Sequence, residues 1–152
     1  MTSLDAELNA YKANFLNNAP AAAIGVIDRW VAELAAGGIA GRVIPVGQLA
    51  PDFSLPNANG KMVRLAGLRA SGPVVVTFYR GEWCPYCNLA VRAYQRALAE
   101  INSLGASLVA ISPQTPDNSL TFQETAKLGY EVLSDRGNAV AREFGIVYRL
   151  GD

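Results

Sequence analysis

The sequence predicts an α/β protein whose mainly parallel central sheet is flanked by helices. The prediction rests on strand-like runs that alternate with helical runs along most of the chain. An apolar run over residues 74–79 precedes a helical run over 88–102, and a second apolar run over 106–111 precedes another helix. Continuous apolar runs of this length are typical of strands buried on both faces of a parallel sheet.

The amino-acid composition makes several classes of function unexpected for this chain. The chain has 152 residues, of which 51% are hydrophobic, enough for one domain with a sizeable core. Its 13 basic residues balance 13 acidic ones, so neither a nucleic acid nor an anionic membrane is an expected partner. The longest apolar run is too short to span a bilayer, and residues 1–7 do not resemble a secretory signal. We therefore expect a cytoplasmic protein.

Residues 1–40 are predicted to be an N-terminal helical extension of a single globular unit over 41–152. A first helix is indicated by apolar residues at helical spacing, namely Leu4, Leu8, Tyr11 and Phe15, and residues 17–20 interrupt it. A second amphipathic helix is predicted from about Ala21 to Ala36, where a pair of glycines stops it. These helices either pack on their own domain or form a hairpin that binds a partner, which makes a homodimer possible.

The remaining elements follow from turn signals and alternation. Residues 57–60 predict a tight turn between a short strand and an alternating strand over 61–65, a hairpin that leads into the apolar run over 74–79. Asp117 is the predicted cap of a helix that reaches about Leu128 and ends at Gly129. The last predicted elements are a strand over 130–133, a helix through Phe144 and a strand over 146–150.

Both cysteines of the chain, Cys84 and Cys87, stand two residues apart between a predicted strand and a predicted helix. This arrangement is the redox signature of thioredoxin-like βαβ proteins. Side chains three residues apart in a first helical turn lie about 5–6 Å apart at Cβ, close enough for a disulfide after small adjustments. Proline at position 85 suits the first helical position and places Cys84 at the cap. A helix N-terminus lowers a thiol pKa from about 8.5 to roughly 3.5–7.5 and favours the nucleophilic thiolate.

The cysteine pair has two other interpretations, a structural zinc site and inert core thiols. A structural zinc site needs four ligands, and a chain with two cysteines and no histidine supplies too few. Inert core thiols are the second alternative, because free cysteine is often buried. The sequence thus predicts redox chemistry without a metal or cofactor. The lack of histidine also excludes Cys–His activation, so a thiolate must depend on the helix dipole, hydrogen bonds or a nearby cation.

Several spaced blocks of the sequence form a recognisable set. The blocks are Gly47 with Ala50-Pro51-Asp52-Phe53 and Leu55, the strand 74–79, Leu108 to Pro113, Phe122 with Leu133-Ser134-Asp135, and Ala141 to Gly145. Together they resemble the peroxiredoxins of the alkyl hydroperoxide reductase/thiol-specific antioxidant (AhpC/TSA) family. The resemblance covers roughly residues 47–147 and leaves the N-terminal helices outside. It implies a thioredoxin-like fold and a peroxidase whose disulfide is reduced by a thioredoxin- or glutathione-type donor.

The active-site loop departs from the family pattern. Aligned by the preceding strand, Arg80 stands where the family has proline, Cys84 where it has threonine or serine, and Cys87 where it has the peroxidatic cysteine. The resemblance implies that Cys87 attacks the peroxide as a thiolate and that Cys84 resolves the sulfenic acid to a disulfide. Arg80 is either a cation that lowers a thiol pKa or a solvated loop charge.

Two rival functions remain. In a thioredoxin-like oxidoreductase Cys84 is the attacking thiol and Cys87 the resolving one, with a protein or small disulfide as substrate. In a redox sensor the N-terminal helices bind a partner and the disulfide sets the affinity. The chain also stops before the antiparallel strand pair and the peroxide-polarising arginine that follow in family members. If that is the natural end, the sheet has an unpaired edge beside the active-site strand, which a swapped or partner-supplied strand would cover; a truncated chain is the alternative.

Overall fold

The computed structural model describes residues 2–149, which form two compact units. One unit comprises residues 51–140, and the other joins the residues up to Ala50 to those from Ala141 onward. The division of the chain at residue 40 stays a prediction.

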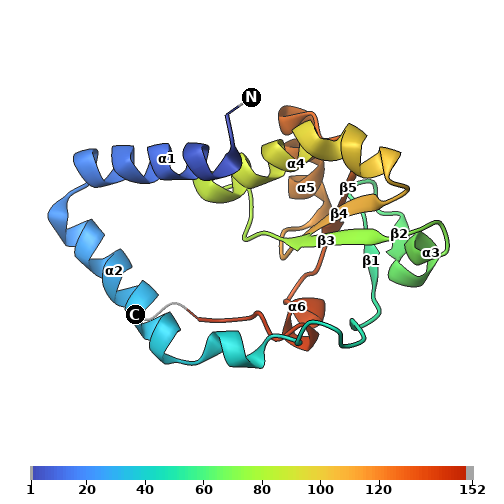
Figure 1. The fold of residues 1–152 in the computed structure, drawn as a ribbon, viewed down its shortest axis with the longest axis horizontal. Coiled ribbons are helices and arrows are strands. Elements are labelled where there is room, and N and C mark those ends of the chain that lie inside the picture. The colour runs from blue at the N-terminus through green and yellow to red at the C-terminus, as the bar shows by residue number, and fades with distance from the viewer. Residues whose placement is uncertain (1, 150–152) are drawn as a thin grey trace. The chain divides into compact units, whose positions relative to one another are not determined.

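The unit over residues 51–140 is built on a parallel sheet (Figure 1). Its strands are β3 (Val74–Phe78), β4 (Ser107–Ser112) and β5 (Glu131–Ser134), in that spatial order. An antiparallel hairpin of β1 (Ser54–Pro56) and β2 (Met62–Arg64) precedes them, turning at Gly60, whose φ is 78°. The predicted hairpin and the predicted mainly parallel α/β fold are both confirmed.

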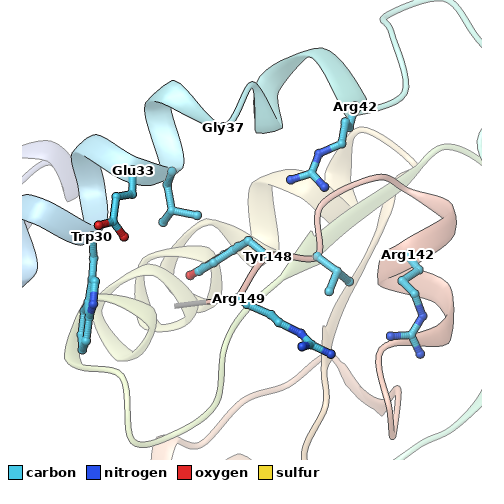
Figure 2. A pocket seen from close by; sticks show the side chains of 9 residues that line it. Trp30, Glu33, Gly37, Arg42, Arg142, Tyr148 and Arg149 are labelled. Carbon is cyan, nitrogen blue, oxygen red and sulfur yellow. The ribbon is translucent and has the colours of Figure 1, made fainter. Parts of the chain in front are cut away.

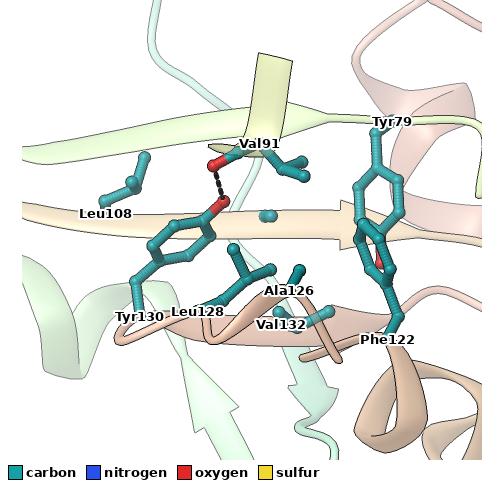
Figure 3. Close-up of a cluster of buried hydrophobic side chains, with 9 residues drawn as sticks. Tyr79, Val91, Leu108, Phe122, Ala126, Leu128, Tyr130 and Val132 are labelled. Atoms are coloured by element: carbon teal, nitrogen blue, oxygen red, sulfur yellow. Dashed lines mark hydrogen bonds between the residues drawn. The ribbon is translucent and has the colours of Figure 1, made fainter. Parts of the chain in front are cut away.

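Two long helices cover one face of this sheet. Helix α4 (Pro85–Ser103) packs on β4, and α5 (Pro116–Ala126) packs on β5. The apolar side chains of these helices pack against alternate residues of the strands and form one buried cluster (Figure 3). Within this cluster the Tyr130 hydroxyl donates a 2.8 Å hydrogen bond to the Val91 carbonyl. The cluster consists of Tyr79, Val91, Leu108, Ala110, Phe122, Ala126, Leu128, Tyr130 and Val132.

The other unit contains both predicted N-terminal helices. Helix α1 (Leu4–Asn18) begins at Ser3, whose hydroxyl accepts a 3.2 Å hydrogen bond from the Ala6 amide. Helix α2 (Ala21–Ala36) ends at Gly37, and a 3₁₀ helix, η1 (Ile39–Arg42), follows. Along the described helices α1 and α2 no side chain is buried. In the part of the chain that the structure describes, no helix is long and apolar enough to cross a membrane.

Three sequence predictions need correction. The strand predicted to continue through Leu65 ends at Arg64, and Leu65 begins a short helix, α3 (Leu65–Arg69). Leu65 is buried. A buried apolar residue fits both the end of an alternating strand and the start of a helix, so the alternation did not distinguish these two structures. Helix α5 is capped by Thr115 rather than Asp117, because Pro116 occupies the first helical position. The same helix ends at Ala126 rather than at Gly129.

The end of the described chain also differs from expectation. Helix α6 (Ala139–Glu143) is present as predicted, but residues 146–149 form no strand, and residue 150 lies outside the described residues. An alternating run becomes a strand only where a neighbour supplies backbone hydrogen bonds. Within residues 2–149 strand β3 pairs only with β4, so the predicted open edge beside the active-site strand is present.

Candidate active site

The two cysteines lie at the start of helix α4. Cys84 is the N-cap residue and Pro85 the first helical residue, as the sequence predicted. The Cys84 sulfur accepts a 3.4 Å hydrogen bond from the Cys87 amide, in the place where a serine or aspartate oxygen commonly caps a helix. The sulfur therefore takes up one of the amides that the first helical turn leaves without a partner.

The loop that carries the dithiol continues directly from strand β3. The Tyr79 amide donates to the Ile111 carbonyl at 2.9 Å and prolongs the pairing with β4. The chain then turns at Gly81, whose φ of 140° is in a region that side chains rarely adopt. A Cβ at Gly81 would stand only 2.6 Å from the indole nitrogen of Trp83. Glycine at this position therefore permits the tight approach of the Trp83 ring.

Arg80 contacts the sulfur of Cys84. Its Nη2 lies 3.0 Å from the Cys84 Sγ, and its guanidinium carbon lies 5.1 Å from the centroid of the Trp83 ring. This is the range of cation–π attraction, which holds a guanidinium over an aromatic face. The guanidinium of Arg80 thus lies against both the Cys84 sulfur and the Trp83 ring.

The thiols of the pair have opposite electrostatic environments. Burial raises the pKa of Cys84, but hydrogen bonds from the Cys87 side chain and backbone and from Arg80 outweigh it and leave the Cys84 pKa below its usual value. Burial also raises the pKa of Cys87, and its hydrogen bond to Cys84 raises it further, although hydrogen bonds from Arg80 act in the opposite direction. The net pKa of Cys87 lies above its usual value. The environment therefore favours a thiolate at Cys84 over a thiolate at Cys87.

The two cysteines also differ in solvent exposure, and the one with the lowered pKa is the less exposed. Cys84 has 0% of its surface exposed, whereas Cys87 is partly exposed and packs against the edge of the buried cluster. The sulfur with the lowered pKa is thus enclosed, and the sulfur with the raised pKa is the one that a small molecule reaches more easily.

Two residues that the sequence analysis missed hold the loop in place. The side-chain oxygen of Gln114 accepts a 2.9 Å hydrogen bond from the Glu82 amide. The side-chain amide of Asn88 donates to the carbonyls of Glu82 and Cys84, at 2.5 and 3.0 Å. Gln114 follows β4, and the carboxyl ends of adjacent parallel strands meet at one edge of a sheet. The position of Gln114 just after β4 could therefore have predicted, from the sequence, that it lies near the loop that follows β3.

Comparison with known proteins identifies the family. The family model described as "AhpC/TSA family" matches residues 46–150. The chain belongs to the AhpC/TSA family. The resemblance inferred from the sequence blocks and the thioredoxin-like fold are thereby confirmed.

Relatives within the AhpC/TSA family are peroxiredoxins. A chloroplastic peroxiredoxin Q of Gentiana triflora is 33% identical over 100 residues, which cover 66% of this chain and 46% of the relative. The crystal structure of peroxidoxin BcpB from Mycobacterium tuberculosis is 33% identical, with a TM-score of 0.65 and 68% of each chain covered. Peroxiredoxin Q of Xanthomonas campestris, at 21% identity and a TM-score of 0.59, shares the fold. The chain spans about half the length of the curated relatives it matches, 46% in the first case.

Proposed function

We propose that this chain is a thiol-dependent peroxidase that reduces hydrogen peroxide or organic hydroperoxides through a Cys84–Cys87 dithiol/disulfide cycle. The observation that carries the proposal is the hydrogen-bonded series of Arg80, Cys84 and Cys87 at the start of α4. Membership of the AhpC/TSA family supports it, because the relatives named above are peroxiredoxins.

The cycle has three balanced steps. The Cys87 sulfur attacks one oxygen of the peroxide, the O–O bond breaks, and the other oxygen leaves as water or an alcohol after taking a proton. Cys87 is then a sulfenic acid. The Cys84 sulfur attacks it, a disulfide forms, and the hydroxyl departs as water. Two thiols of an external reductant restore the dithiol and become a disulfide themselves.

Cys84 serves as the proton acceptor for Cys87 in this scheme. The Cys87 thiol is hydrogen-bonded to the Cys84 sulfur, which has the lowered pKa and is the thiolate in this proposal. As Cys87 attacks, its proton passes to Cys84, so the more exposed sulfur reacts while the enclosed sulfur acts as base. A chain without histidine needs such a base, because the usual imidazole partner is lacking.

Arg80 has two tasks in the proposal. Its guanidinium stabilises the thiolate through the 3.0 Å contact to Cys84. It also hydrogen-bonds Cys87, so a positive charge stands where the leaving oxygen becomes negative. Fixed cations beside a developing charge are a large source of transition-state stabilisation.

The reductant and the setting complete the proposal. A thioredoxin- or glutathione-type donor reduces the disulfide, in a compartment such as the cytoplasm where thiols are kept reduced. The named plant relative is a chloroplast protein. A homodimer through the N-terminal helices is the proposed assembly. Cell fractionation and the mass of the reduced protein in solution test these two points.

The deciding experiment measures the rate at which the reduced protein reacts with hydrogen peroxide, with mass spectrometry to locate the product. We expect a rate far above that of free cysteine, abolished in Cys87→Ser. Cys84→Ser should react more slowly and accumulate a sulfenic acid on Cys87. A rate equal to that of free cysteine would overturn the peroxidase.

One observation favours a second candidate, a thiol–disulfide oxidoreductase. The lowered pKa lies on Cys84, the first cysteine of the pair, which is the attacking thiol in thioredoxin-like exchange. In that case a mixed disulfide with a substrate thiol accumulates on Cys84 in Cys87→Ser. Failure of Cys87→Ser to form a mixed disulfide on Cys84 would exclude this order of attack.

A further inference from the structure

A cavity of about 610 Å³ lies within the unit formed by the N-terminal helices and the C-terminal segment, away from the dithiol in sequence (Figure 2). Its volume is in the range of small-molecule sites. One wall is formed by Trp30 and Glu33 of helix α2, and another by Tyr148 and Arg149. None of the chemistry proposed for the cysteines uses these residues.

The cavity gathers positive charge. Among the described residues, three arginines, Arg42, Arg142 and Arg149, line it together with Glu33. In the chain as a whole the 13 basic and 13 acidic residues cancel, so this is a local excess. Figure 2 shows the Arg42 guanidinium extending toward the C-terminal segment, whereas the side chains of Arg142 and Arg149 extend away from α2. All three line the cavity, and like charges gathered at one cavity favour an anion there.

The backbone brings these arginines together. Gly145 has a φ of 73°, and a Cβ there would collide with the carbonyl of Arg42. The Ile44 amide donates a 3.4 Å hydrogen bond to the Phe144 carbonyl beside this point. Arg42 is therefore held against the segment that carries Arg149, although more than a hundred residues separate them.

Two aromatic side chains, Trp30 and Tyr148, line the same cavity and are each partly buried. Guanidinium groups bind phosphate oxygens in pairs of hydrogen bonds, and aromatic faces stack on flat rings. We infer that this cavity is a binding site for a nucleotide-like ligand, with its phosphates on the arginines and its planar ring against Trp30 and Tyr148. This site is independent of the peroxidase chemistry.

Calorimetric titration of the whole chain tests the inference. The probes are ADP, GDP, UDP, adenosine and inorganic pyrophosphate at equal ionic strength. At least one nucleoside diphosphate should bind ten times or more tightly than both adenosine and pyrophosphate, because the arginines and the aromatic rings each contribute. If pyrophosphate binds as tightly as all three diphosphates, the ring site is wrong. If no diphosphate binds, the inference as a whole is wrong.

Matched variants locate the binding. Arg42→Gln and Arg142→Gln, both at exposed residues, should each weaken diphosphate binding about tenfold, through the loss of charge-assisted hydrogen bonds. Arg136→Gln, at an exposed arginine outside the cavity lining, is the control and should leave the affinity unchanged. Equal losses in all three variants would indicate non-specific attraction and overturn the site.

Fluorescence gives an independent measurement. The chain has two tryptophans, and Trp83→Phe leaves Trp30 as the single tryptophan emitter. Diphosphate binding should change its emission in this variant, and Trp30→Leu should weaken binding while keeping an apolar side chain. Unaltered Trp30 emission at a saturating diphosphate concentration would contradict the placement of the ring.

Discussion

Apolar residues mark both the central strands and the N-terminal helices in the sequence, but their side chains differ in burial. Ile111 of β4 and Leu133 of β5 have 0% of their surface exposed, whereas Leu16 of α1 and Val31 of α2 are 43% and 60% exposed. Periodicity therefore predicts that an element forms, and its neighbours decide whether the element is buried. Stability is expected to be concentrated in the unit over residues 51–140.

The largest test of this difference compares two leucine truncations. Leu133→Ala should lower the free energy of unfolding by about 2–5 kcal/mol, because it leaves a cavity in a packed core. Leu16→Ala, at an exposed helix position, should cost less than about 1 kcal/mol. Urea denaturation of both variants measures the two values. Equal losses would mean that the N-terminal helices have a core of their own.

The next test concerns the loop between β3 and α4, which carries Arg80 and Cys84. Arg80→Gln removes the guanidinium from Cys84, so the pKa of Cys84 should rise and the peroxide reaction at neutral pH should slow by a factor of about three to ten. Ultraviolet absorbance of the thiolate across a pH titration follows the pKa, and stopped-flow kinetics follow the rate. Arg69→Gln, on α3, is the matched control and should change neither.

The third test uses the opposite pKa shifts. The pKa of Cys84 is lowered in the folded protein, so this thiol adds stability as pH rises toward the ordinary cysteine value of about 8.5. The pKa of Cys87 is raised, so the stability it adds is lost as pH rises above that value. The contribution of the pair should therefore be largest near pH 8.5. Urea denaturation of the reduced protein and of Cys84→Ser/Cys87→Ser at several pH values measures it, and a monotonic difference would refute the opposite shifts.

The smallest effect is expected at the start of α1. Ser3→Ala removes the hydroxyl that accepts the Ala6 amide and should weaken the helix by about 1 kcal/mol. Hydrogen exchange should become faster in the first turns of α1 and remain unchanged in β4 and β5. Faster exchange in the strands as well would show that the two units unfold together.

The sequence predicted most of the sheet domain because its signals are local. The paired cysteines, Pro85 and the apolar strands act within a few residues of one another, so cap, helix and strand were all anticipated. Helix α3 was missed because five residues are too few to establish a helical period. The strand expected at 146–149 failed because a strand depends on a partner that the local pattern cannot reveal.

The candidate site was only partly predictable for the same reason. Arg80 lies four residues before Cys84, and its contact was anticipated as one of two interpretations. The hydrogen bond from Glu82 to Gln114 joins residues 32 positions apart and exists only once β3 and β4 are paired. The division of charge between the thiols likewise depends on burial and hydrogen bonds, which spacing alone does not determine.

The use of the Cys84 sulfur as a helix cap has a consequence for reduction potential. In the reduced protein this sulfur accepts the Cys87 amide and contacts Arg80, and its lowered pKa shows that these contacts favour the thiolate. A disulfide sulfur is neutral, so oxidation deprives the helix terminus and the guanidinium of their anion. Interactions that stabilise only the dithiol make the couple more oxidising, since the potential measures the free-energy gap between the two forms. A Cys84–Cys87 disulfide should therefore be reduced readily by ordinary cellular thiols, as the proposed dithiol/disulfide cycle requires.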